Sequence, residues 1–389
     1  MSQLLESRWS ETKEALLEGL QGNKRQVMAA TLENTRKYLA ESATAGATSA
    51  GNIATLNRVI LPVIRRVMPT VIANELVGVQ PMTGPVGQIH TLRVRYSDAF
   101  TGSAGGSTTA GEEALSPFKI AEGYSGASPG KPASTAALEG VAGNKLSIQI
   151  LKQTVEAKTR KLSARWTFEA AQDAQAQQGI DIEAEIMAAL AQEITAEIDQ
   201  EVLRSLSTLS STVLTYDQAA VSGTATFVGD EHAALAVQIN RAANLIAQRT
   251  RRGAGNYAVV SPTTLTLLQS ATTSAFARTT EGTFEAPTNT KFVGTLNSAM
   301  KVYVNSYAEN DDVLIGYKGG SESDAPAFYC PYIPLMSSGV VLDPATFEPV
   351  VSFMTRYGYV ELTNTASSLG NAADYLAKVA VTSANLRFA

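Results

Sequence analysis

The segment that decides the fold is IDIEAEIMAALAQEITAEIDQEVLRSL, from Ile180 to Leu206. Its large apolar residues recur every fourth position, which is the spacing of one face of an α-helix. The residues are Ile182, Ile186, Leu190, Ile194, Ile198, Val202 and Leu206. At a rise of about 1.5 Å per residue, the segment predicts a rod roughly 36 Å long. We expect this rod to be the spine helix of one lobe.

The residues before the spine helix predict a long two-stranded arm. Apolar and polar residues alternate from Gln88 to Tyr96 and again from Lys145 to Leu162, as in half-exposed strands. The stretch from Thr101 to Gly143 is rich in Gly, Ala, Ser and Thr, so little core is expected there and the arm should end in a loose tip. A shorter helix from Thr167 to Gln178 should lead into the spine helix.

The N-terminal part predicts a second, helical arm. Leucines, Val27 and Met28 lie at roughly helical spacing among charged residues in positions 1–41. The small residues of 42–52 predict a flexible joint, and two short helices are expected over 57–74, where Pro62 and Pro69 interrupt the pattern.

The part of the chain after Asp217 alternates between helix and strand. A helix is predicted from His232 to Arg252, with Gly253 ending it, and Ser261 followed by Pro262 has the form of a helix start. The predicted strands are 257–260, 300–304, 313–317, 340–342, 347–354 and 378–386. The whole chain is therefore predicted to be an α+β protein of several lobes.

Composition excludes several classes of protein. The net charge of -5 argues against a body that binds nucleic acid by neutralising phosphates, and only 17% of residues are charged, so much of the surface is expected to face other protein. The single cysteine, Cys330, rules out an internal disulfide and fits folding in the cytosol. No apolar run approaches a membrane span, and the first residues do not have the form of a signal peptide.

No motif predicts catalysis, a metal or a cofactor. His90 and His232 have no second histidine or cysteine nearby, and SPGKP at 128–132 lacks the leading glycine and the Ser or Thr of a phosphate loop. The acids near 309–312 are a solvated turn rather than a calcium loop, and Cys330 in its apolar surroundings is a buried small side chain. The many acids of the spine helix are expected to form a solvated or partner-facing side rather than catalytic pairs.

Several segments resemble the major capsid protein of T-even-like tailed phages, in the same order along residues 57–360. They are PVIRRVMPTVIANELVGVQPMTGPVGQIHTLRVRY from Pro62, SARWTFEAAQDAQAQQGIDIEAEI from Ser163, VYVNSYAENDDVLIGYKG from Val302, FYCPYIPL from Phe328 and TRYG from Thr355. The resemblance implies the Hong Kong 97-type capsid fold, divided into an N-terminal arm (1–87), an extended loop (88–165), a peripheral domain with the spine helix (166–215 and 336–389) and an axial domain (216–335).

The same resemblance implies a shell protein without enzymatic activity. Such a protein assembles as hexamers and pentamers into an icosahedral head that encloses the DNA genome without sequence-specific binding, in the virion and, during assembly, in the host cytoplasm. Scaffold, portal, vertex and decoration proteins are the implied partners, although the short low-complexity stretch 101–143 puts decoration in doubt. The alternative within this fold is an encapsulin-like nanocompartment shell.

Two kinds of site follow. In this family a head protease cuts after Leu-x-Glu or Ile-x-Glu, and Leu39-Ala40-Glu41 has that form, so Glu41 is a candidate maturation site. The fold that the resemblance implies places the extended loop in contact with the spine helix of an adjacent subunit. Bases exceed acids in the loop and acids exceed bases in the spine helix, so we expect charge to help hold this contact. The predicted interface residues are Arg65, Arg66, Lys152, Lys158, Arg160, Lys161, Glu193, Glu197 and Glu201.

Overall fold

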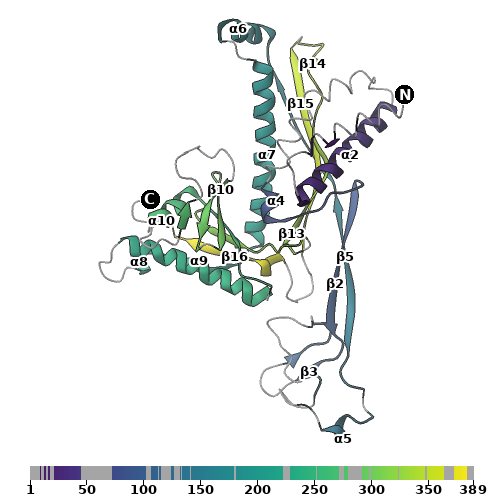
Figure 1. Ribbon diagram of the computed structural model, residues 1–389, viewed down its shortest axis with the longest axis vertical. Helices are drawn as coiled ribbons and strands as arrows, with labels where there is room; N and C mark the ends of the chain where they lie inside the picture. Colours follow the sequence, from purple (N-terminus) through teal and green to yellow (C-terminus); the bar gives the residue numbers. More distant parts are fainter. Residues whose placement is uncertain are drawn as a thin grey trace. The chain divides into compact units, whose positions relative to one another are not determined.

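The computed structural model divides the chain into two compact units (Figure 1). Unit 1 holds residues 1–87, 155–205 and 327–360, and unit 2 holds residues 88–154, 206–326 and 361–389. The structure describes residues 9, 13–14, 16–17, 22–44, 72–101, 107–112, 114, 124–126, 132, 134–140, 142–178, 181–221, 228–250, 252–270, 276–278, 291–297, 299–322, 324–346, 348–362 and 372–382. The chain is a mixed helix and sheet protein, as its patterns predict.

Unit 1 is built on a five-stranded sheet. Its order is β1 (Gly78–Val79), β13 (Ala327–Ser337), β15 (Pro349–Glu361) and β14 (Val341–Leu342), and β6 (Lys158–Arg165) also pairs with β15. β1 runs parallel to β13, whereas β6 and β14 run antiparallel to β15. β6 thus leaves the arm and joins this sheet, although the alternating pattern predicts one continuous strand from Lys145 to Leu162.

The strand β13 is the main element that the sequence analysis does not predict. It contains Pro331 and Pro334, and proline is normally excluded from the middle of a sheet because it has no N–H to donate. Here Pro331 takes part through its carbonyl, which accepts a hydrogen bond from the Met82 N–H at 3.0 Å. Ten of the eleven residues of β13 are buried, so burial holds the strand in place despite the prolines.

The helices of unit 1 pack on this sheet. The spine helix is α7 (Ile182–Leu209), preceded by α6 (Phe168–Gln178), and it lies beside β15 in Figure 1. The N-terminal helix α2 (Gly22–Thr44) contacts β13 and buries Val27, Met28 and Leu32. The short helix α4 (Ala73–Leu76) leads into β1. The predicted spine helix is confirmed. The predicted joint at 42–52 is wrong at its start, because residues 42–44 continue the helix α2. The rest of the joint and most of the predicted helices at 57–74 lie outside the described residues.

Unit 2 contains the two-stranded ribbon of β2 (Val86–Tyr96) and β5 (Leu146–Glu156). Beyond it come β3 (Phe100–Thr101), β4 (Ser107–Thr108) and α5 (Thr135–Leu138). Much of the predicted loose tip, 101–143, lies outside the described residues, but Tyr124 within it contacts the end of the ribbon. The Tyr124 ring packs on the buried Tyr96 in a tilted arrangement with centroids 4.5 Å apart, and its hydroxyl lies within hydrogen-bond distance of the carbonyls of Asp98 and Lys145, which share its one proton.

The rest of unit 2 is a seven-stranded sheet with helices on it. The order is β7 (Thr212–Tyr216), β16 (Leu376–Val381), β12 (Val313–Gly316), β8 (Tyr257–Val260), β11 (Met300–Val304), β10 (Lys291–Leu296) and β9 (Phe276–Arg278). The helices are α8 (Gln218–Val221), α9 (Val228–Thr250), α10 (Pro262–Ser270) and the 3-10 helix η1 (Ala372–Tyr375). Leu235, Ile239 and Ile246 of α9 pack into the core against the strands.

Local signals in unit 2 are mostly confirmed. The Ser261 hydroxyl accepts the backbone N–H of Thr264 at 3.1 Å, so Ser261 caps α10 as its position before Pro262 predicts. The helix α9 begins four residues earlier than the predicted start at His232, and its described part ends at Thr250. Strand β16 begins two residues before the predicted 378–386 and ends at Val381, and residues 383–386 of the prediction lie outside the described residues.

Candidate functional site

The side-chain network that joins the spine helix to the sheet of unit 1 is centred on Arg160. This residue lies on β6, next to β15, and its guanidinium reaches three partners. Nη1 lies 2.8 Å from Glu197, Nη2 lies 2.6 Å from Glu201, and Nε donates to the Tyr357 hydroxyl at 2.6 Å. Glu197 and Glu201 are one helical turn apart on α7, so both carboxylates face the same guanidinium.

The electrostatics of this network follow from its half-buried position. Burial alone would raise the pKa of Glu201, but hydrogen bonds from Tyr357 and Arg160 outweigh burial, and the pKa is lowered. Burial lowers the pKa of Arg160 and the bonds to Glu201 and Tyr357 raise it, with a net rise. Burial and the neighbouring Glu201 raise the pKa of Tyr357. The network is therefore an ion pair completed by a neutral phenol, which is suited to holding a helix in place.

Further contacts continue along the same elements. The Ser205 hydroxyl donates to the Tyr359 hydroxyl at 2.8 Å, which ties the end of this part of α7 to β15. The Tyr357 ring packs against Tyr329 of β13 with centroids 5.3 Å apart, and the Thr355 hydroxyl donates to the Ile333 carbonyl. The spine helix is thus fixed to the sheet by polar side chains as well as by its apolar face.

The structure brings together some of the predicted interface residues and leaves others apart. Arg160, Glu197 and Glu201 meet, but they do so within one chain. Among the described residues, no ion pair reaches Lys152, Lys158, Lys161 or Glu193, and all four are exposed. Lys158 influences Glu201 only through space. The sequence pattern identifies the right charges, but spacing alone cannot say whether the partners belong to one subunit or two.

The remaining predicted site residues lie at the N-terminal side. Arg65 and Arg66 lie outside the described residues. Glu41 lies inside α2, three residues before its end at Thr44. The cleavage at Glu41 stays a prediction, and an intact mass of the mature protein would test it.

Two exposed surfaces are absent from the sequence-based list. On β5, Leu146, Ile148 and Ile150 alternate with polar residues on one face and are 55%, 68% and 66% exposed. We call these three residues the apolar stripe. Lys145 directly precedes the stripe. Lys152 follows it two residues after Ile150 and lies on the same face, because side chains two apart on a strand share a face. The signal was present as strict alternation, but alternation does not say which face is covered.

The second exposed surface is the first part of the spine helix. Every described residue from Asp181 to Ala189 is exposed or half-buried, and burial begins at Leu190. Ile182, Ile186 and Met187 are half-buried there, with Glu183 and Glu185 on the same segment. In the part of the chain that the structure describes, no ion pair reaches these two acids. We call Asp181–Ala189 the free end of the spine helix.

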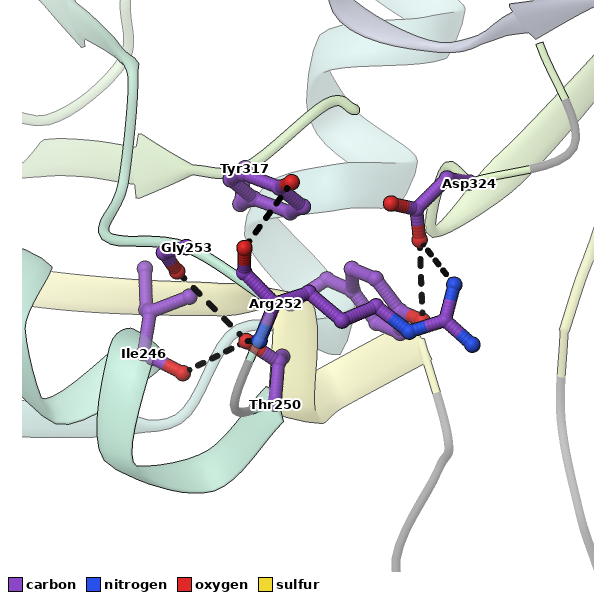
Figure 2. Close-up of polar contacts among 7 residues, drawn as sticks. Ile246, Thr250, Arg252, Gly253, Tyr317 and Asp324 are labelled. Carbon is purple, nitrogen blue, oxygen red and sulfur yellow. Dashed lines mark hydrogen bonds and ion pairs between the residues drawn. The ribbon is translucent and has the colours of Figure 1, made fainter. Parts of the chain in front are cut away.

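Unit 2 contains two polar side-chain clusters that connect its own helices and loops to one another. The buried His232 of α9 lies 2.5 Å from the Ser270 hydroxyl, and burial lowers the pKa of its imidazole. In the cluster of Figure 2, the Arg252 guanidinium pairs with Asp324 at 2.5 Å, and the Tyr317 hydroxyl donates to the Arg252 carbonyl. Thr250 accepts the Arg252 N–H and donates to the Ile246 carbonyl, so this cluster finishes α9 rather than forming a binding site.

Chemical sites are not found within the described ranges. No group of three His, Cys, Asp or Glu side chains there could hold a metal ion, and no helix there is long and apolar enough to cross a membrane. Burial raises the pKa of the Cys330 thiol to about 11, which keeps this buried thiol protonated and unreactive.

Comparison with known proteins identifies what the chain resembles. The family model described as major capsid protein Gp23 matches residues 53–381. The major capsid protein of Vibrio phage KVP40 is 30% identical over 85% of this chain and 81% of its own length, and that of Enterobacteria phage T4 is 30% identical over 82% and 78%. Among solved structures, Mycobacterium phage Bobi matches 79% of this chain and 89% of its own with 13% identity and a TM-score of 0.47. The capsid of phage XM1 matches 79% and 91% with 9% identity and a TM-score of 0.45.

Proposed function

The chain belongs to the family of the major capsid protein Gp23 and is a structural component of a tailed-phage capsid, and on this premise we propose that it assembles as hexamers and pentamers into an icosahedral head that encloses the DNA genome. The family is one of structural proteins and not of enzymes. The relatives give no support to the alternative of a nanocompartment shell. The net charge of -5 favours enclosure of the genome without sequence-specific binding.

The proposal includes the four-part domain organisation that a Hong Kong 97-type fold implies. The N-terminal arm, extended loop, peripheral domain and axial domain keep the ranges given above. Subunits form in the host cytoplasm and end in the virion shell, where scaffold, portal, vertex and decoration proteins are the proposed partners. Arg65 and Arg66 stay proposed interface residues.

The observation that best supports assembly is the apolar stripe of β5. A two-stranded ribbon is only marginally stable in water, and exposed rows of Leu and Ile usually mark a contact surface. Leu146, Ile148 and Ile150 form such a row on a ribbon that has 11 residues in each strand. We infer that a second copy of the chain covers this row in the assembled shell.

The surface that complements the apolar stripe is the free end of the spine helix. It offers half-buried Ile182, Ile186 and Met187 beside Glu183 and Glu185, and the apolar stripe has Lys145 and Lys152 at its two ends. Each side of the proposed contact therefore has apolar residues with charged residues beside them. The charges on the two sides are opposite in sign. Because Glu197 and Glu201 already bind Arg160, Glu193 and the free end are the acids left for a neighbouring arm, with Lys152, Lys158 and Lys161 as its proposed partners.

Electron microscopy of the expressed chain tests the function. We expect closed shells or tubes in negative stain, and a chain that stays as small discrete particles at every concentration would contradict the proposal. The interface is tested by Ile148→Asp, which introduces a charge into the apolar stripe and should abolish assembly. Circular dichroism should show that the variant keeps its secondary structure.

The matched control is Ser147→Asp, because Ser147 is the exposed neighbour of Ile148 on the opposite face of the same strand. This variant adds the same charge without entering the apolar stripe, and it should assemble like the parent chain. Equal assembly of the two variants would refute the proposed contact while leaving the shell function intact.

A further inference from the structure

A carboxyl group is buried where the N-terminal segment meets the spine helix. Asp199 lies on α7, and its side chain shares the apolar face of Val202 and Leu206 rather than the acidic face. Only 1% of its surface is exposed. Its Oδ1 accepts the backbone N–H of Ile72 at 2.8 Å. Ile72 precedes α4, so one carboxyl oxygen fastens the entry of this segment to the middle of the spine helix.

The second carboxyl oxygen is left without a hydrogen bond. Oδ2 of Asp199 is buried and no group of the described chain donates to it. The segment bound to Asp199 is apolar and closely packed, with Ala73, Leu76 and Val77 all fully buried. The Asp199 carboxyl is therefore almost completely shielded from solvent while the junction is closed.

Among the residues that the structure describes, the charged groups around this junction offer no compensating cation. The titratable side chains on the neighbouring elements are Glu75 of α4, Tyr329 and Cys330 of β13, Tyr357 of β15 and Glu201 of α7. Arg160 is committed to Glu197 and Glu201, and Lys24 is committed to Glu75. Within the described part of the chain, a negative charge on Asp199 would thus be held by one backbone N–H, that of Ile72.

We propose that Asp199 is a proton-dependent latch, which holds the segment beginning at Ile72 against the spine helix while its carboxyl is neutral and loosens it when the carboxyl ionises. A buried anion with a single donor gains by opening the junction and becoming hydrated, whereas a neutral carboxyl does not. The proposal concerns a contact within one chain and does not depend on how subunits assemble.

The pH range follows from the two states of the junction. Burial raises the pKa of Asp199 to about 7, against the lowering effect of the Ile72 hydrogen bond, while the hydrated carboxyl of the open junction has its ordinary value. A raised pKa in the closed state means that the closed junction retains a proton which the open junction releases. Closure is therefore favoured at low pH, is progressively weakened as the pH rises toward 7, and changes no further above that value.

Hydrogen exchange of the Ile72 amide tests the latch directly. We expect the protection factor of Ile72, corrected for the intrinsic rate at each pH, to fall by up to about tenfold per pH unit between about 5 and 7, since one proton is released per opening. It should be constant from pH 7.5 to 9. A protection factor that does not change with pH in the parent chain overturns the proposal without recourse to any variant.

Two variants assign the effect to this carboxyl. Asp199→Asn keeps an oxygen that can accept the Ile72 N–H but cannot ionise, so its protection should not vary with pH. Glu193→Gln removes an exposed carboxyl from the same helix and should leave the pH profile of the parent chain unchanged. A profile that survives in Asp199→Asn would show that another group is responsible and would refute the assignment.

Discussion

The ion pair between Arg160 and Glu201 provides a quantitative test of how the spine helix is attached. The changes are Arg160→Met and Glu201→Gln, made singly and together in a double-mutant cycle. Methionine keeps much of the arginine stem, and glutamine keeps the size of Glu201 and an oxygen that can accept from Tyr357. The cycle thus measures the charged contact itself rather than lost packing.

The expected coupling can be estimated from the geometry. Hydrogen bonds to charged groups contribute about 1.5 to 3 kcal/mol when shielded from water, and exposed ion pairs about 0.2 to 1 kcal/mol. The Arg160 and Glu201 side chains are 32% and 39% exposed, so they lie between these cases. We expect a coupling of about 1 kcal/mol in the free energy of unfolding.

Urea unfolding of the unassembled chain, followed by tryptophan fluorescence, is the assay. The matched control pairs Arg160→Met with Glu193→Gln, which lies on the same helix with no ion pair to Arg160, and its coupling should stay within about 0.5 kcal/mol of zero. A Glu201 coupling no larger than the Glu193 coupling would refute the reasoning. A coupling that arose only in assembled particles would restore the contact between subunits that the sequence predicts.

Two further outcomes test other parts of the molecule. A Cβ added at Gly358 would lie 2.4 Å from Val155 Cγ1 and 3.3 Å from Met82 Sδ, so Gly358→Ala should lower the free energy of unfolding by about 1 to 3 kcal/mol in the same urea assay. Tyr124→Phe removes the hydroxyl that donates to Asp98 and Lys145, so limited proteolysis should cut the arm tip faster than in the parent chain. The exposed Tyr307→Phe serves as the control for the second change, and equal cutting of both variants would contradict the role of Tyr124.

The sequence by itself determined the elements whose signals are local. The spine helix follows from apolar residues at every fourth position, and α10 follows from Ser261 before Pro262, because the hydrogen bonds that form a helix and its cap join residues close in the chain. The family is equally determined by the sequence, since the motifs between Pro62 and Gly358 resemble it and the family model matches residues 53–381.

Only the tertiary structure decided which strand is buried and which charges meet. The prolines of β13 contradict strand propensity, and the strand exists because β1 and β15 flank it in the sheet and α2 packs against it. Arg160 is a generic base in the sequence until β6 pairs with β15 and turns it toward Glu197 and Glu201 of its own chain.

Asp199 shows, within a single helix, the same difference between what the sequence determines and what only the tertiary structure decides. The sequence places it among many acids of the spine helix, and composition assigns all of them to a solvated or partner-facing side. Its spacing from Val202 and Leu206 already places it on the apolar face, but a periodic pattern does not reveal that the Ile72 N–H meets it there. That contact joins residues 127 positions apart, and contacts at such separation are fixed by packing of the whole unit rather than by any local preference.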